Sequence, residues 1–130
     1  MATWDDVRRL ALAMPEATER PSYDQAPAWR VKDKLFVWER PLRGKDLRDL
    51  GDDAPTGAVL GVRVPHEGAK QALIAEQPDV YFTIPHLDGY PAVLVRLDAI
   101  GVDDLGELVA EAWLDRAPKK LAQAYLDASP

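Results

Sequence analysis

The chain has 130 residues, of which 47% are hydrophobic, enough for one domain with a core and too few for two ordinary domains. Its net charge of −6 argues against nucleic acid as a default partner, and the absence of cysteine excludes disulfides, thiolate catalysis and cysteine-based metal sites. We expect a single, monomeric domain over residues 1–130. Since no apolar run has the length of a signal peptide or of a membrane span, we expect the protein to be cytoplasmic and without membrane contact.

A helix is predicted at the start of the chain. Thr3 and Asp6 have the spacing of a capping box, and Pro15 ends the helix. Apolar residues recur at helical spacing and predict one buried face, made of Trp4, Val7, Leu10, Ala11 and Met14.

Three strands are predicted next. A short strand is expected within Ala17–Arg20, and two clearer strands contain Trp29–Val31 and Leu35–Trp38. Lys32 and Asp33 between them are interpreted as a two-residue hairpin turn, although the usual glycine is missing.

Residues 41–57 are polar and rich in glycine and proline, which predicts a long loop. Loops of this length inside a compact domain are often functional or mobile. Leu47 and Leu50 are expected to form a single helical turn that touches the rest of the domain.

A strand over Ala58–Val64 follows, in which Gly61 indicates a bulge or a close approach of another group. A short helix is predicted over His66–Glu76, with an inward face formed by Ala69, Ala72, Leu73 and Ala75. Val80–Ile84 is predicted as the next strand.

The stretch Ile84–Leu97 begins as a turn and continues as an apolar strand, which we expect near the centre of a sheet. Gly101 breaks the chain, and Asp103 is expected to cap the strongest predicted helix, whose apolar face comprises Leu105, Leu108, Val109, Ala112 and Trp113. A last helix is predicted after Pro118.

Catalytic and metal motifs are missing from the sequence. A triad would have to combine Ser22 with His66 or His86, but no nucleophile-elbow motif supports it. The two histidines do not have metal-ligand spacing and are interpreted as turn or cap residues, and no glycine-rich phosphate loop is present. We therefore expect no enzyme activity, no cofactor and no metal.

Positive charge is concentrated in residues 20–48, which carry eight basic and four acidic side chains. Three predicted strands also place an arginine between apolar neighbours: Arg30, Arg63 and Arg96. If these strands are adjacent, the arginines share one sheet face opposite the helices and could bind phosphate or carboxylate groups. The alternative is a solvated face on which they pair with carboxylates such as Glu39, Asp79 or Asp98.

The whole chain resembles the MmcQ/YjbR family of small bacterial proteins. The resemblance is carried by the opening helix and residues 12–19, Ala28–Val31 with Lys34–Phe36, Tyr81–Thr83, the turn Pro85–Tyr90, the helix Leu108–Trp113 and Ala117–Lys119. It implies an α+β fold in which an antiparallel sheet is packed with N-terminal and C-terminal helices, similar to the CyaY-like arrangement. Members of the family are commonly labelled DNA-binding, although no binding motif accompanies that label.

We therefore expect a non-enzymatic binding protein whose partner is double-stranded DNA. The alternative is a module that binds a small anionic ligand or a protein partner. The residues expected to contact nucleic acid lie in the basic segment and the arginine-bearing strands: Arg30, Lys32, Lys34, Arg40, Arg43, Lys45, Arg48, Arg63 and Arg96.

Overall fold

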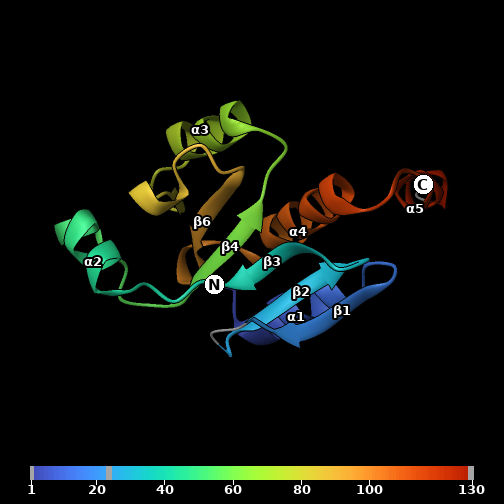
Figure 1. Cartoon of the computed structure of the whole chain (residues 1–130), viewed down its shortest axis with the longest axis horizontal. Helices are drawn as coiled ribbons and strands as arrows, with labels where there is room; N and C mark the ends of the chain where they lie inside the picture. Colours follow the sequence, from blue (N-terminus) through green and yellow to red (C-terminus); the bar gives the residue numbers. More distant parts are fainter. Residues whose placement is uncertain (1, 23–24, 129–130) are drawn as a thin grey trace.

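The computed structural model describes residues 2–22 and 25–128. In chain order its elements are α1 (Trp4–Leu12), β1 (Ala17–Pro21), β2 (Pro27–Val31), β3 (Lys34–Glu39), α2 (Gly44–Leu50), η1 (Gly51–Asp53), β4 (Val59–Arg63), α3 (Glu67–Glu76), β5 (Tyr81–Phe82), η2 (Pro85–Leu87), β6 (Ala92–Arg96), η3 (Leu97–Ala99), α4 (Val102–Arg116) and α5 (Lys119–Ala128). The strands form one antiparallel sheet in the order β1-β2-β3-β4-β6-β5 (Figure 1). This is the predicted α+β class.

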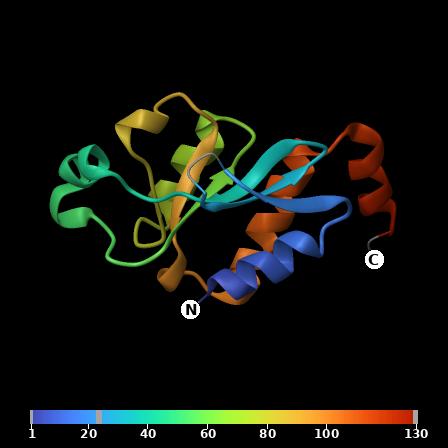
Figure 2. The ribbon, with the colours of Figure 1, turned by 60° about the horizontal axis from the view of Figure 1, so that its bottom comes forward.

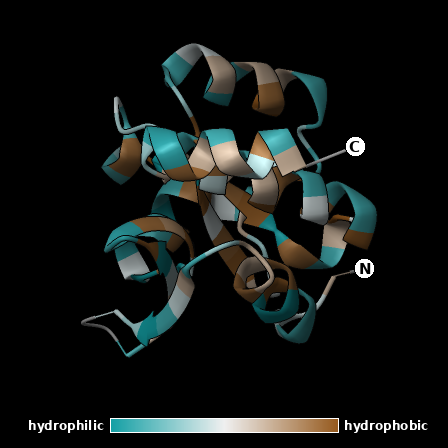
Figure 3. Ribbon diagram, turned by 90° about the vertical axis from the view of Figure 1, so that its right-hand side faces the viewer, coloured by the Kyte–Doolittle hydropathy of each residue, from teal (hydrophilic) through white to brown (hydrophobic). Residues whose placement is uncertain are grey.

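Helices α1 and α4 lie together on one face of the sheet, as the turned view shows (Figure 2). Their apolar stripes bury Val7, Leu105 and Trp113 against strand residues such as Trp29 and Phe36. Hydrophobic colouring concentrates where these helices meet the sheet (Figure 3). Within residues 2–22 and 25–128, no helix combines the length and apolarity needed to cross a bilayer.

Local chemistry at the start of the chain matches the sequence prediction. The Thr3 hydroxyl accepts a hydrogen bond from the Asp6 N–H at 3.2 Å, and the Asp6 carboxylate accepts one from the Thr3 N–H at 2.9 Å. The capping box therefore forms and satisfies two backbone donors that the first turn of a helix leaves unpaired.

The β2–β3 turn also forms as predicted. Lys32 and Asp33 have φ angles of 49° and 66°, the left-handed pair that a two-residue hairpin requires. Asp33 accepts a hydrogen bond from Arg20 at 2.8 Å, a contact that joins the turn to β1. A residue type that tolerates the left-handed region thus replaces glycine.

Three sequence predictions differ from the structure. Residues 41–57 contain the seven-residue helix α2 followed by the 3₁₀ turn η1, rather than a loop with one helical turn. The N-cap of α4 is Gly101, so Asp103 lies in the first turn and complements the helix dipole. On α3, Ala72 and Ala75 are exposed, whereas Lys70 is buried.

Glu19 connects three elements and provides a pH-dependent contribution to stability. Its carboxylate accepts hydrogen bonds from the Arg8 side chain at 2.8 and 3.2 Å and from the Trp29 indole N–H at 3.0 Å. The hydrogen bond from Arg8 is the main cause that lowers the pKa of Glu19 below its ordinary value of 4.5. Ionised Glu19 therefore stabilises the fold above about pH 4.5, and this contribution is lost as the pH falls through the lowered pKa.

We expect Glu19→Gln to reduce the free energy of unfolding at pH 7 by about 1 kcal/mol, because the charge-assisted hydrogen bonds are weakened. The difference from the wild type should shrink as the pH falls below 4. Urea unfolding between pH 3 and pH 7 measures both effects. Glu107→Gln is the control, since Glu107 is exposed and makes no ion pair with a described residue; an equal pH dependence in both variants would contradict the assignment.

Candidate functional site

The sheet face opposite α1 and α4 is only partly covered. Trp38 pairs with Ala28 on one neighbouring strand and with Gly61 on the other, so all three residues lie on this face. Over β4, β6 and β5 the face is covered by a second apolar cluster, to which Leu42 and Leu50 contribute from residues 42–50. Over β2 and β3 the described residues form no such layer, and the surface is hollowed.

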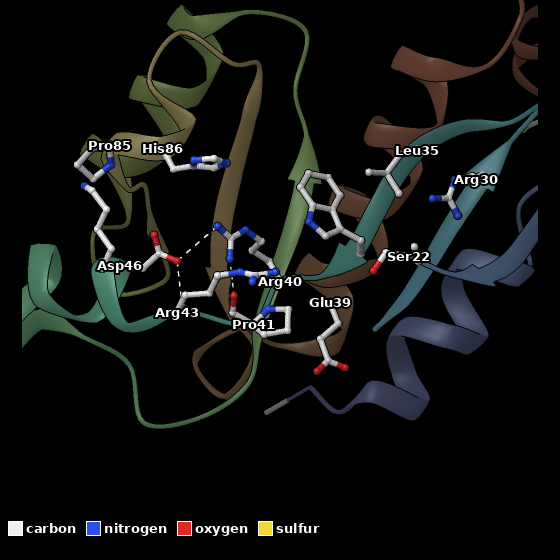
Figure 4. Close-up of a pocket in the computed structure, with 13 residues that line it drawn as sticks. Ser22, Arg30, Leu35, Glu39, Arg40, Pro41, Arg43, Asp46, Pro85 and His86 are labelled. Carbon is white, nitrogen blue, oxygen red and sulfur yellow. Dashed lines mark hydrogen bonds and ion pairs between the residues drawn. The ribbon is translucent and has the colours of Figure 1, made fainter. Parts of the chain in front are cut away.

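The hollow is a cavity of about 780 Å³, which we call the Trp38 groove. Its floor contains Ala28 and Trp38. One side, the hairpin wall, contains Ser22, Arg30 and Leu35; the opposite side, the helix wall, contains Arg40, Arg43, Lys45, Asp46 and His86 (Figure 4). The volume falls within the range of small-molecule binding sites.

The floor depends on a glycine. Gly61 lies directly beneath the Trp38 indole, and a Cβ added at Gly61 would lie 2.4 Å from a ring carbon of Trp38. Trp38 is consequently 9% exposed and packs beside Ala28, Leu35 and Ala92. Of the two readings that the sequence allowed for Gly61, the close approach is correct, because the pairing of β4 with both neighbours is regular.

The helix wall is held by a buried carboxylate. Asp46 is 5% exposed and accepts a hydrogen bond from the Arg43 backbone N–H at 3.0 Å, while an Arg40 nitrogen lies 3.4 Å from the same carboxylate. Arg40 also donates a hydrogen bond to the Pro41 carbonyl. These contacts fix the segment before α2, so the Arg40 guanidinium is a positioned cation rather than a freely moving one.

Positive charge predominates in the Trp38 groove. The described residues that line it include four cations and two carboxylates: Arg30, Arg40, Arg43 and Lys45 against Glu39 and Asp46. Arg30 donates to the Arg20 carbonyl at 3.3 Å and makes no ion pair with a described carboxylate. Lys45 pairs with Asp49 at 3.0 Å, but its side chain stays 73% exposed. An anion entering the groove therefore meets a local excess of positive charge in an otherwise acidic chain.

The nine predicted nucleic-acid contacts separate into three groups. Four of them line the Trp38 groove, namely Arg30, Arg40, Arg43 and Lys45. Lys32 pairs with Glu16 at the hairpin turn, whereas Lys34 and Arg48 are exposed outside the groove. The basic segment thus supplies one cluster and several isolated surface charges.

The remaining two predicted contacts, Arg63 and Arg96, have structural roles. Arg63 donates to the Pro91 carbonyl at 3.0 Å and lies 5.0 Å from the centre of the Tyr90 ring. Arg96 donates to the Asp53 and Pro78 carbonyls, at 3.0 and 3.2 Å, and lies 4.5 Å from the Phe82 ring.

Their cross-strand partners place Arg63 and Arg96 on the same sheet face as Arg30, as predicted. In the antiparallel pairing of β4 with β6, however, they stand at opposite ends, so the three arginines do not form a row. The alternative pairing with Glu39, Asp79 or Asp98 is also not observed for Arg63 and Arg96, since both donate to backbone carbonyls.

The two histidines have different surroundings. His66 caps α3, accepting a hydrogen bond from the Ala69 N–H at 3.0 Å, as the sequence predicted for a cap residue. His86 instead lines the helix wall of the groove, opposite Ser22 (Figure 4). No hydrogen bond joins Ser22 to His86, so these residues do not form a nucleophile–base pair. Among the described residues, no group of three potential metal ligands is found.

Sequence reasoning missed part of the groove. Leu35, Asp46 and His86 were not predicted as lining residues, although all three line it. Leu35 and Trp38 lie on one face only because the β2–β3 pairing shifts register between Trp29 and Arg30. The proline-rich turn before β6 was the one sequence signal that could have pointed to His86.

Comparison with known proteins shows which family of proteins this chain is similar to. The family model described as YjbR matches residues 12–115. An uncharacterized protein of Mycobacterium tuberculosis, Rv2570, and one of Mycobacterium bovis, Mb2600, are each 56% identical to this chain over 129 residues, covering 97% of both chains. The crystal structure of Deinococcus radiodurans protein DR2400, a DUF419 domain, superposes with a TM-score of 0.65 at 23% identity, covering 88% of this chain and 78% of that one. This last similarity supports the fold.

Proposed function

We propose that this chain, which belongs to the YjbR family, works as a non-enzymatic binding protein that holds a phosphate-bearing ligand in the Trp38 groove. The observation that carries this proposal is the convergence of four cationic side chains on one cavity, Arg30 from β2 and the other three from residues 40–45. Guanidinium groups match phosphate oxygens in charge and geometry, and a concave site shields such contacts from solvent and salt.

The groove favours a ligand small enough to enter it. Its cations line a hollow of about 780 Å³, whereas Lys32, Lys34 and Arg48, which a larger partner would also contact, do not continue the cluster. The chain as a whole carries a charge of −6, which repels a long polyanion.

Duplex DNA is the second candidate. It is favoured by one observation, that four of the nine residues predicted to contact DNA line the same groove. If a duplex binds there through four phosphate contacts, the logarithm of its affinity should fall with the logarithm of salt concentration with a slope of about −3.6.

The proposal predicts that pyrophosphate binds to the groove and that Arg30→Gln combined with Lys45→Gln weakens this binding at least about tenfold. Both residues line the groove, and neither bonds to the buried Asp46. Isothermal titration at low salt measures the affinity. Thermal unfolding with ligand at a hundredfold its Kd should show about 2.7 kcal/mol of added stability.

The matched control is Lys32→Gln combined with Lys34→Gln, which removes the same charge outside the groove. It should retain nearly wild-type affinity. Equal losses in the two double variants would indicate a diffuse electrostatic effect and contradict the groove. Absence of binding to both pyrophosphate and a 20-base-pair duplex at low salt would overturn the proposed function.

A further inference from the structure

The Trp38 groove has an apolar strip as well as charged walls. Ala28, Leu35 and Trp38 form a small cluster on the open sheet face and all line the cavity. The strip comprises the floor of the groove and Leu35 of the hairpin wall, which Figure 4 shows between Arg30 and Arg40. A bare phosphate ion binds through hydrogen-bond donors and cations alone. It would therefore gain no contact from an apolar floor between the charged walls.

The Trp38 indole presents a small part of its surface to the cavity, because it is 9% exposed. Its six-membered ring is packed on Gly61, so it is held in one orientation by the backbone beneath it. A rigid aromatic side chain contacts planar groups without losing side-chain entropy on binding, and every nucleobase has a planar face. Arg30 beside the strip could also stack through its guanidinium plane.

The two walls are unequal in charge. Three of the four cations, Arg40, Arg43 and Lys45, belong to the helix wall together with the carboxylate of Asp46, whereas Arg30 is the charged residue of the hairpin wall. A ligand with several negative charges at one end and a flat, weakly polar body at the other fits this asymmetry.

We propose that the ligand of the Trp38 groove is a nucleotide, with its phosphates at the helix wall and its base against Trp38 and Leu35. This inference rests on the proposed function, because it requires that the groove bind phosphate. The hydroxyl of Ser22 and the Arg30 guanidinium, on the hairpin wall, are placed to donate to acceptor atoms of the base or sugar.

The experiment compares ADP, pyrophosphate and adenosine by isothermal titration against the full chain. ADP and pyrophosphate share the diphosphate, and ADP and adenosine share the base. Because stacking of one base adds substantially to affinity, ADP should bind at least about tenfold tighter than pyrophosphate, and adenosine should bind weakest. Equal affinities for ADP and pyrophosphate would overturn the nucleotide inference and leave the proposed function standing, whereas absence of binding by either would overturn both.

Two variants test the position of the base. Trp38→Phe keeps an aromatic side chain but reduces its area, and Leu35→Ala shortens the same apolar strip without touching Trp38 itself. Each should reduce the preference for ADP over pyrophosphate while leaving pyrophosphate affinity within about twofold. If Trp38→Phe fails to fold, Leu35→Ala still tests the proposal; an unchanged ADP preference in Leu35→Ala would contradict the assigned base position.

A further titration distinguishes a free nucleotide from a nucleotide within a strand, since both present the same groups. A five-residue oligothymidylate is compared with thymidine diphosphate. Affinity within about threefold for the two supports a single-nucleotide site. Binding of the oligonucleotide more than threefold tighter, with the loss in the Arg30→Gln and Lys45→Gln double variant retained, identifies a single strand as the source of the nucleotide.

Discussion

Replacing Lys70 with methionine is expected to lower the free energy of unfolding by about 3 kcal/mol, the largest effect of any single substitution considered for this protein. Lys70 is fully buried on α3, and its ammonium donates to the Leu87 and Tyr90 carbonyls at 2.8 and 3.1 Å and to Glu67 at 3.2 Å. Methionine fills a similar volume but leaves both carbonyls without their donor. Buried acceptors that lose a charged donor carry a large penalty.

The Lys70 contacts also affect the groove. Leu87 and Tyr90 belong to the turn that carries His86, so loss of their anchor should loosen part of the helix wall. We therefore expect Lys70→Met to weaken pyrophosphate binding as well as stability, although Lys70 does not line the cavity. Urea unfolding, together with amide hydrogen exchange of residues 85–91, measures the two consequences.

Lys120→Met is the control for Lys70→Met. Lys120 is exposed on α5 and its side chain makes no hydrogen bond or ion pair with a described residue, so the same chemical change should alter stability by less than about 0.5 kcal/mol. A stability loss in Lys70→Met no larger than that of the control would show that the buried ammonium is dispensable. Faster exchange spread over the whole chain, rather than concentrated in residues 85–91, would contradict the local anchoring role.

The second large effect is expected for Gly61→Ala, which should destabilise the protein by about 2 kcal/mol. Alanine normally improves on glycine inside a strand, because glycine loses more conformational entropy on folding. Here the added Cβ would lie 2.4 Å from the Trp38 indole, and a rigid ring on a neighbouring strand must move to make room. The displaced indole would enter the Trp38 groove and reduce binding of pyrophosphate and ADP.

Two comparisons make this prediction specific. Gly106→Ala on α4 adds a Cβ at an ordinary 3.6 Å from Leu10, so it should stabilise the helix by about 1 kcal/mol. Combining Gly61→Ala with Trp38→Leu should recover part of the lost stability, because the smaller side chain frees space. Chemical unfolding and near-ultraviolet circular dichroism follow stability and the tryptophan environment; a neutral Gly61→Ala would contradict the close packing of Trp38.

Local sequence signals predicted local structure well. The capping box of Thr3 and Asp6 and the left-handed turn at Lys32 and Asp33 each depend on a few neighbouring residues, and each is present. The apolar stripe over 105–113 likewise predicted the buried face of α4, since spacing in the chain determines which side chains share a helix face. Predictions failed where the partner was distant, as on α3, where buried Lys70 binds carbonyls 17 and 20 residues away.

The sequence by itself determined the α+β class, the alternation that places Arg30, Arg63 and Arg96 on one sheet face, and the concentration of positive charge in residues 20–48. Only the tertiary structure decided which cationic side chains lie close together. Antiparallel pairing places Arg63 and Arg96 at opposite strand ends, where they hold loops, while the segment before α2 brings Arg40 and Arg43 across from Arg30. The physical reason is that periodicity determines the direction of a side chain from its own strand, whereas a binding groove depends on the order, register and coverage of several strands, which are long-range properties.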